Sequence, residues 1–152
     1  MPEKETLRRA AKDKRQGKSP STQAGEFVRE EIHHVREGKH GARSTKQAIA
    51  IGLSKARRAG VKLPVPKRGK ASKATRKAAA RDLAKGRQHK RPSKTRSRAM
   101  TKALKREPRS AASHRALSTQ AHRSARRRTH AERSASARKA ARTRAKNQRA
   151  RS

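Results

Sequence analysis

The sequence predicts a chain that is mostly disordered, with short α-helices and one helical hairpin near the N-terminus. Two observations lead to this prediction. Lys and Arg number 47 of 152 residues against 10 Asp and Glu, which gives a formal net charge of +37. Ile, Leu, Val and Phe together number only 14. When such residues make up less than about a fifth of a highly charged chain, their burial is not expected to offset the entropy lost on ordering the backbone.

The composition changes partway along the chain, which predicts three regions. Residues 1–66 have 16 basic and 7 acidic residues and 11 of the 14 large apolar ones. Residues 67–152 have 31 basic and 3 acidic residues and the remaining 3 large apolar ones. We expect a disordered lead-in over residues 1–20 and a two-helix hairpin over 21–63. A disordered basic tail of Ala, Ser, Arg and Lys with nascent helices is expected over 64–152.

The first helix of the hairpin is predicted over about residues 21–37. Val28, Ile32 and Val35 fall at positions i, i+4 and i+7, the spacing of one apolar helix face. Gly38 is placed to end this helix.

The second helix has clearer boundaries. Ser44 and Gln47 have the spacing of a capping box, and Gly60 is placed at the position after the C-cap. Gly52 costs helix propensity, but on the apolar side it lets the first helix approach closely. The connecting loop is short, so the two helices are expected to pack as an antiparallel hairpin.

A hairpin with about eight useful apolar side chains has a marginal core. Ile51 projects from the opposite side of the second helix and is not used by the hairpin. We therefore expect the hairpin to form a homodimer or to become ordered only on a partner.

The cations of the tail are the strongest indication of function. Each Lys or Arg that neutralises a phosphate releases condensed counterion, so log K for duplex DNA falls with log salt by about 0.9 per contact. Double-stranded DNA is the expected partner, favoured over RNA. Binding is expected to be independent of sequence, because a disordered tail fixes no side chain against a base edge. The residues expected to contact phosphate are Lys39, Arg43, Arg57, Arg58, Lys67, Arg68, Lys70, Arg126, Arg127 and Arg128.

Other interpretations stay open at this stage. Ribosomal extensions share this composition, so an RNA- or ribosome-binding protein is the first alternative. A protein-interaction module with an accessory basic tail is the second. The hairpin also imitates two helices of a helix-turn-helix, and the loop from Gly38 to Ser44 is interpreted either as a flexible turn or as a phosphate site at a helix N-terminus.

No catalytic, cofactor-binding or metal site is predicted, and the chain is not expected to be an enzyme. It has no Cys, and only three acids follow residue 66. His33 and His34 are adjacent on a helix and cannot easily face one ion, so with His40 they are interpreted as surface residues. No apolar run approaches the roughly 18 residues that span a bilayer. No membrane partner is expected, and the N-terminus lacks the apolar stretch of a secretory signal, which indicates the cytoplasm and its nucleoid.

The segment from Ser21 to Gly60 resembles a helical domain of small basic bacterial proteins. Its most distinctive part runs from Arg29 to Gly60 and reads REEIHHVREGKHGARSTKQAIAIGLSKARRAG. Such proteins have no settled function and are sometimes labelled DNA-binding or histone-like. The resemblance covers about 40 of 152 residues and implies a bacterial source and DNA binding, with no catalytic residue. The tail resembles linker-histone tails in composition alone, with more Arg and Ser and fewer Pro.

Overall fold

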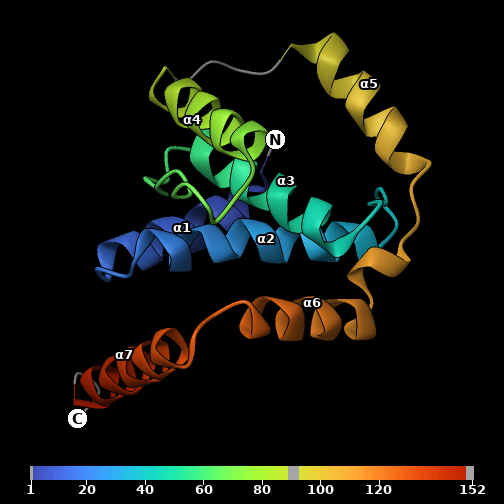
Figure 1. Cartoon of the computed structure of the whole chain (residues 1–152). Helices are drawn as coiled ribbons and strands as arrows, with labels where there is room; N and C mark the ends of the chain where they lie inside the picture. Colours follow the sequence, from blue (N-terminus) through green and yellow to red (C-terminus); the bar gives the residue numbers. More distant parts are fainter. Residues whose placement is uncertain (1, 89–92, 150–152) are drawn as a thin grey trace. The chain divides into compact units, whose positions relative to one another are not determined.

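The computed structural model describes residues 2–88 and 93–149, which form seven α-helices and one short 3-10 helix (Figure 1). The elements are α1 (Lys4–Arg15), α2 (Pro20–Arg36), α3 (Thr45–Arg58), α4 (Lys73–Arg87), α5 (Lys94–Lys105), η1 (Ser110–Ala112), α6 (His114–Arg126) and α7 (His130–Arg149). By its internal contacts the chain divides into two units, residues 1–116 and residues 117–152.

The prediction of a mostly disordered chain is wrong, because helices cover 74% of it. The count of large apolar residues underestimates what this sequence can bury. Of the 13 buried hydrophobic residues in the described part of the chain, 8 are Ala. Alanine has the highest helix propensity and allows helices to pack closely through backbone and Cβ contacts. A chain rich in Ala therefore orders with few large side chains.

The expected lead-in over residues 1–20 contains helix α1, which packs against α2. Thr6 and Ala10 of α1 are buried in this contact. Helix α2 begins slightly earlier than predicted, because Ser19 is its N-cap and Pro20 its first residue. The Ser19 Oγ accepts a hydrogen bond from the Thr22 N–H at 3.3 Å. A Pro at this position is favourable, since its missing N–H would have no intrahelical partner.

Helices α2 and α3 form the predicted hairpin, and the boundaries of α3 are confirmed. The Ser44 Oγ accepts from the Gln47 N–H at 3.2 Å, and the Gln47 Oε1 accepts from the Arg43 N–H at 2.7 Å. At the other end, Gly60 has a φ of 92°. Its N–H donates to Arg57 O, and the next N–H, that of Val61, donates to Ala56 O. This is a Schellman motif, which needs a residue in the left-handed region after the C-cap.

Gly52 brings the two helices of the hairpin into backbone contact, as predicted. A Cβ atom built on Gly52 would lie 2.7 Å from Val28 Cα and 3.0 Å from Phe27 O. These neighbours are backbone atoms of α2, which cannot rotate aside. Any side chain at this position would therefore force α2 and α3 apart.

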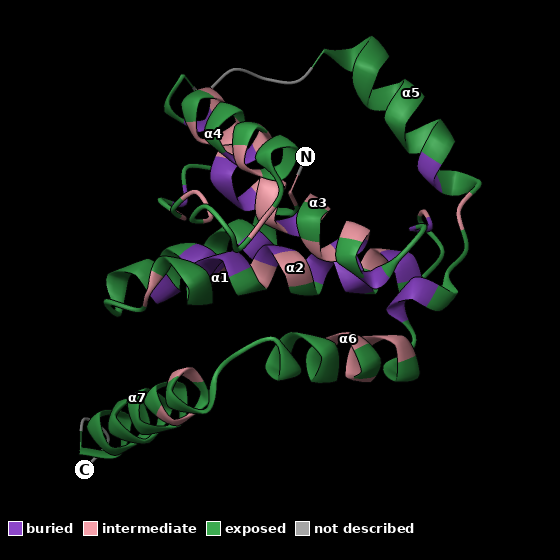
Figure 2. Ribbon diagram, in the orientation of Figure 1, coloured by how far each residue is buried: buried purple, intermediate pink, exposed green. Residues whose placement is uncertain are grey.

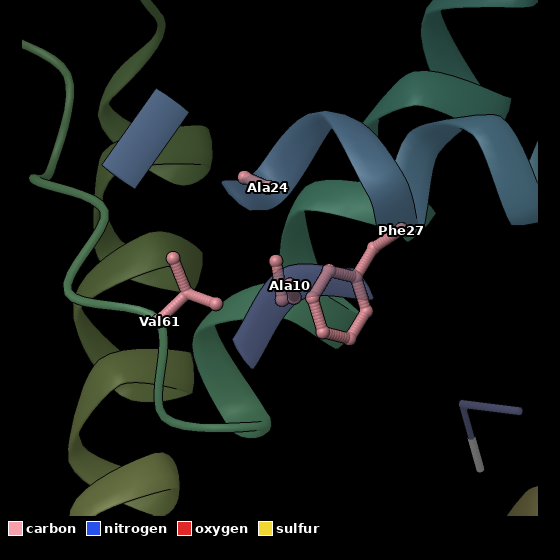
Figure 3. Close-up of a cluster of buried hydrophobic side chains, with 5 residues drawn as sticks. Ala10, Ala24, Phe27 and Val61 are labelled. Carbon is pink, nitrogen blue, oxygen red and sulfur yellow. The ribbon is translucent and has the colours of Figure 1, made fainter. Parts of the chain in front are cut away.

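The main apolar cluster forms around Phe27, the single aromatic residue of the chain (Figure 3). Its ring lies among small side chains contributed by α1, α2, α3 and the segment after α3. These residues are Ala10, Ala24, Ala56 and Val61. Leu53 and Leu63 pack against the cluster while partly exposed. Phe27 is 1% exposed and is therefore a core residue.

The first part of the expected tail folds onto the hairpin as helix α4, which packs against α3. A Cβ atom on Gly86 would lie 2.1 Å from Arg57 O, so α4 touches the backbone of α3 there. Asp82 of α4 accepts a hydrogen bond from the Ser54 Oγ at 2.7 Å and pairs with Arg58 at 3.7 Å. Residues 73–87 are thus part of the folded first unit.

Helices α5, α6 and α7 are mostly exposed, with several half-buried residues in the first half of α6 (Figure 2). Leu104 is the one buried residue of α5, and no described residue of α6 or α7 is buried. Helix α7 begins with a capping box that links Thr129 and Glu132. The Thr129 Oγ1 accepts from the Glu132 N–H at 3.2 Å, and the Glu132 Oε2 accepts from the Thr129 N–H at 2.9 Å. Capping and the high propensity of Ala favour this helix without a core.

Replacing Gly52 by Ala is expected to destabilise the protein although Ala is the better helix former. The new Cβ would clash with the α2 backbone, at a cost of roughly 1–3 kcal/mol. Gly25 of α2 is the matched control, because a Cβ there would meet no atom within 4 Å. Gly25→Ala should stabilise the protein by up to about 1 kcal/mol. Urea unfolding of both variants measures the difference, and equal stabilisation by both would contradict the close packing at Gly52.

Candidate nucleic-acid interface

Lys39, one of the residues expected to contact phosphate, is already paired with carboxylates. Its Nζ lies 3.0 Å from Glu3 Oε1 and 3.1 Å from Glu37 Oε2. The hydrogen bond to Glu3, followed by that to Glu37, raises the pKa of Lys39. A phosphate would have to displace two carboxylates, so Lys39 is a weak candidate for the interface.

The loop between α2 and α3 does not present its N–H groups to solvent as a phosphate site requires. The Gly41 N–H donates to Leu104 O at 2.8 Å, and the Ala42 N–H donates to Pro108 O at 3.0 Å. A Cβ atom on Gly41 would lie 1.8 Å from Glu107 O, so the two backbones are in direct contact. The donors expected to hold a phosphate therefore bind the last turn of α5 and the chain that follows it. The Arg43 side chain stays exposed beside this loop.

Two side chains of the hairpin fix the same returning segment further along. The Thr45 Oγ1 donates to Ala111 O at 2.6 Å, and the Arg36 Nε donates to Ala112 O at 2.8 Å. The short helix η1 packs against both α2 and α3 through these contacts. Sequence reasoning missed this docking, because neither residues 104–112 nor the loop has an apolar pattern that would indicate it.

Arg57 was expected to contact phosphate, and the structure buries it. Its residue surface is only 7% exposed, and its Nη2 donates to Pro64 O at 3.3 Å. Desolvation lowers the pKa of Arg57, while the nearby charge of Asp82 acts in the opposite direction. Arg58 is partly exposed and pairs with Asp82. Because α3 contacts α2, α4 and η1, it is also not presented as the reading helix of a helix-turn-helix.

The remaining predicted contacts lie on exposed segments. Lys67, Arg68 and Lys70 are exposed in the connection between α3 and α4. Arg126 ends α6, and Arg127 and Arg128 follow it in the turn before α7. The Arg128 guanidinium donates to Glu132 O at 2.8 Å and to the Ser136 Oγ, so it helps to hold this turn.

A cationic face on α7 was not identified from the sequence. At 100° per residue, five basic residues fall within an arc of about 100° on this helix. They are Arg138, Lys139, Arg142, Lys146 and Arg149. All five are exposed, and Glu132 in the first turn is the single acid of the helix. The spacing is visible in the sequence, but a tail expected to be disordered has no fixed helix face on which to align it.

Helix α5 has a similar arrangement, which was also not identified. Four basic residues lie within an arc of about 80°, and all four are exposed. They are Lys94, Arg98, Lys102 and Lys105.

None of the helices in residues 2–88 and 93–149 combines the length and the apolar character needed to span a membrane.

The histidines near the hairpin do not all lie at the surface. His33 is exposed as expected, whereas the side chains of His34 and His40 are only 12% and 11% exposed. The His34 Nε2 lies 2.8 Å from Glu3 Oε1, and the His40 Nε2 lies 3.0 Å from Glu31 Oε1. Both imidazoles are thus largely hidden beside an acid, His34 beside the exposed Glu3 and His40 beside the buried Glu31.

The pairing of Glu3 predicts a dependence of stability on pH. Hydrogen bonds from His34 and Lys39 lower the pKa of Glu3 from 4.5 to about 2. Since the folded pKa is below the unfolded one, the ionised carboxylate stabilises the fold above about pH 4.5. This contribution is lost as the pH falls towards about 2. The free energy of unfolding should therefore decline more steeply with acid in the wild type than in Glu3→Gln; parallel curves would contradict the pairing.

Comparison with known proteins identifies one part of the chain. Residues 13–68 match a family of unknown function (DUF6496). The match runs from the end of α1 through α2 and α3 to the connection before α4, and it fits the uncharacterised helical domain predicted from Ser21 to Gly60. No curated protein and no solved structure matches the chain.

Proposed function

We propose that this protein binds double-stranded DNA without regard to sequence, as a histone-like protein of the nucleoid. The exposed basic helices after α4 neutralise backbone phosphates, and the N-terminal helices form the folded part that carries them. The observation that supports this proposal most strongly is the cationic face of α7, in which five basic residues share one side of an exposed helix.

The dimensions of this face suit a duplex. From Arg138 to Arg149 the helix rises about 16 Å, at about 1.5 Å per residue. Duplex DNA carries one phosphate charge per roughly 1.7 Å of its axis, so a helix of this length lies beside about ten phosphates. Five aligned cations are enough to neutralise a substantial part of that charge.

The basic helices have almost no internal counter-charge. Only three acids follow residue 66, and two of them are engaged in the fold. Asp82 pairs with Ser54 and Arg58 on α3, and Glu132 caps α7. A surface with this excess of positive charge gains most from an external polyanion.

Other polyanionic partners fit the side chains less well. Helix α7 has no large apolar residue, so it lacks the apolar face that an interfacial helix inserts into a lipid surface. Single-strand binders stack bases on aromatic side chains, and Phe27, the one aromatic residue, is buried in the core. Duplex phosphate is the partner that needs neither feature.

Neutralising the α7 face should weaken DNA binding and reduce its salt dependence. Arg138, Arg142 and Lys146 are exposed and form no hydrogen bond or ion pair with any described group. Changing all three to Gln retains helix propensity and should reduce the slope of log K against log NaCl by about 2.7, which is three contacts at about 0.9 each. Fluorescence anisotropy with a labelled duplex measures the slope.

The control variant changes Arg8, Lys12 and Arg15 of α1 to Gln. These residues are also exposed, and they comprise the same two Arg and one Lys. The control should change the slope by less than one contact. Equal losses in both variants would contradict the assignment to α7. A tenfold preference for structured RNA over the duplex in competition at physiological salt would replace DNA with RNA as the partner.

A further inference from the structure

The fold gathers three metal-ligating side chains that the sequence separates. Glu31 and His34 are three residues apart on α2, a spacing that places them on the same helix face. His40 approaches from the loop after the helix. One donor atom from each of the three lies within 4.8 Å of the others. Sequence reasoning considered His33 and His34 together and overlooked Glu31, which has the productive spacing.

The backbone turn at the end of α2 brings His40 back to the helix. Gly38 has a φ of 75° and donates to Val35 O at 3.2 Å. The following N–H, that of Lys39, donates to His34 O at 3.0 Å. The contact of Gly41 with Leu104 O then holds the loop in place. The position of His40 is therefore determined by two sets of backbone hydrogen bonds.

The hydrogen bonding of His40 leaves a lone pair facing Glu31. The His40 Nδ1 lies 3.0 Å from Gly41 O, and a carbonyl oxygen can only accept, so Nδ1 carries a proton. The Nε2 of the neutral imidazole then has a free lone pair, and it lies 3.0 Å from Glu31 Oε1. Two lone pairs at this distance repel each other unless a proton or a metal cation lies between them. Donation from Nδ1 to a carbonyl is also the second-shell arrangement that orients a metal-binding His.

Glu31 is 1% exposed, so its carboxylate charge is buried and requires a partner within the protein. Lys55 Nζ lies 2.5 Å from its Oε2 and anchors that side of the carboxylate. Neither carboxylate oxygen accepts a hydrogen bond within the described residues. Oε2 is held by the ion pair with Lys55, whereas Oε1 faces the His40 Nε2. Oε1 is thus a buried oxygen ligand directed at His40.

We propose that Glu31, His34 and His40 bind a divalent transition-metal ion of the Zn²⁺ type. Two imidazoles and a carboxylate are donors that Zn²⁺ prefers, with metal–ligand distances of about 2.0–2.2 Å. Tetrahedral ligands at such distances are about 3.3 Å apart. The three donor atoms lie within 4.8 Å of one another, so small side-chain rotations bring them to this spacing. The Glu3 carboxylate lies beside this group, with its Oε1 2.8 Å from the His34 Nε2.

The surroundings favour a dication and give it access. Five acids and four cations surround the cluster and the adjoining hollow, which leaves one net negative charge apart from the imidazoles. The acids are Glu3, Glu5, Glu30, Glu31 and Glu37, and the cations are Arg9, Arg29, Lys39 and Lys55. A surface hollow of about 200 Å³ borders the cluster, and its lining includes Glu3, Glu30 and His34. An ion can therefore reach His34 from solvent. Bound there, it would join the end of α2 to the loop that docks residues 104–112.

Zinc binding to the full-length protein tests this proposal. Isothermal titration with ZnCl₂ at pH 7.5, where free imidazoles are mostly neutral, should give one site per chain. Thermal unfolding with Zn²⁺ present should show a higher Tm than without it, because the ion binds only the folded state. His40→Gln should weaken Zn²⁺ binding by roughly 10- to 100-fold or more, since even a second-shell change costs that much. His33→Gln is the matched control, because His33 is exposed on the same turn of α2 and should bind Zn²⁺ like the wild type.

A second variant keeps the test valid if His40→Gln disturbs the fold. His34→Gln removes a ligand without touching the loop, and far-UV circular dichroism of each metal-free variant checks that it is folded. Absence of a Zn²⁺ site in the wild type would overturn the proposal. Equal affinity in the wild type and in a folded His34→Gln or His40→Gln variant would also overturn it, because the ion would then bind elsewhere, for example at His114, His122 or His130. These outcomes are independent of DNA binding.

Discussion

The rest of the structure depends on one constraint, which is that 47 basic residues share the chain with only 10 acidic ones. Like charges packed into one fold repel each other unless acids are distributed among them. Eight of the ten acids form ion pairs within residues 1–116, and they are Glu3, Glu5, Asp13, Glu26, Glu30, Glu31, Glu37 and Asp82. The compact helices therefore coincide with the part of the chain that has its own counter-charge. The exposed helices that follow lack it, and an external polyanion would supply it.

Packing through small residues is the second condition for this fold. Phe27 is the one large residue at the centre of the main cluster, and its neighbours are mostly Ala. Helices surrounded by such residues approach closely enough for backbone atoms to touch, as α2 and α3 do at Gly52 and α3 and α4 do at Gly86. Dispersion contacts at short range replace the large apolar surfaces of an ordinary core. This is why a chain with 14 large aliphatic and Phe residues still forms a multi-helix unit.

Local signals in the sequence predicted the hairpin well and the rest of the fold poorly. The capping box at Ser44, the turn at Gly60 and the close approach at Gly52 are each set by a few neighbouring residues, and each is confirmed. Helix α1 was missed because the apolar count gave no weight to buried Ala. The extent of α5, α6 and α7 was missed because the count also gave no weight to the helix propensity of exposed Ala. The docking of residues 104–112 depends on backbone hydrogen bonds, which leave no pattern in side-chain type.

The candidate sites show the same division between local and long-range information. The predicted phosphate contacts on exposed segments, such as Lys67 and Arg127, remain exposed, whereas Arg57 is buried by α4 and Lys39 is paired with Glu3 and Glu37. No sequence argument placed Glu3 beside Lys39 or α4 beside Arg57, since these partners lie far apart along the chain. The cluster of Glu31, His34 and His40 likewise required knowledge of the loop path.

The central claim is that a polyanion meets the exposed basic helices, not the α2–α3 hairpin. Amide hydrogen exchange of the full chain, with and without a short DNA duplex at low salt, tests this claim most directly. The account predicts that DNA slows exchange throughout α7 and α5 and leaves the amides of α2 and α3 unchanged. Protection that appears on α2 and α3 while α7 exchanges as before would contradict it.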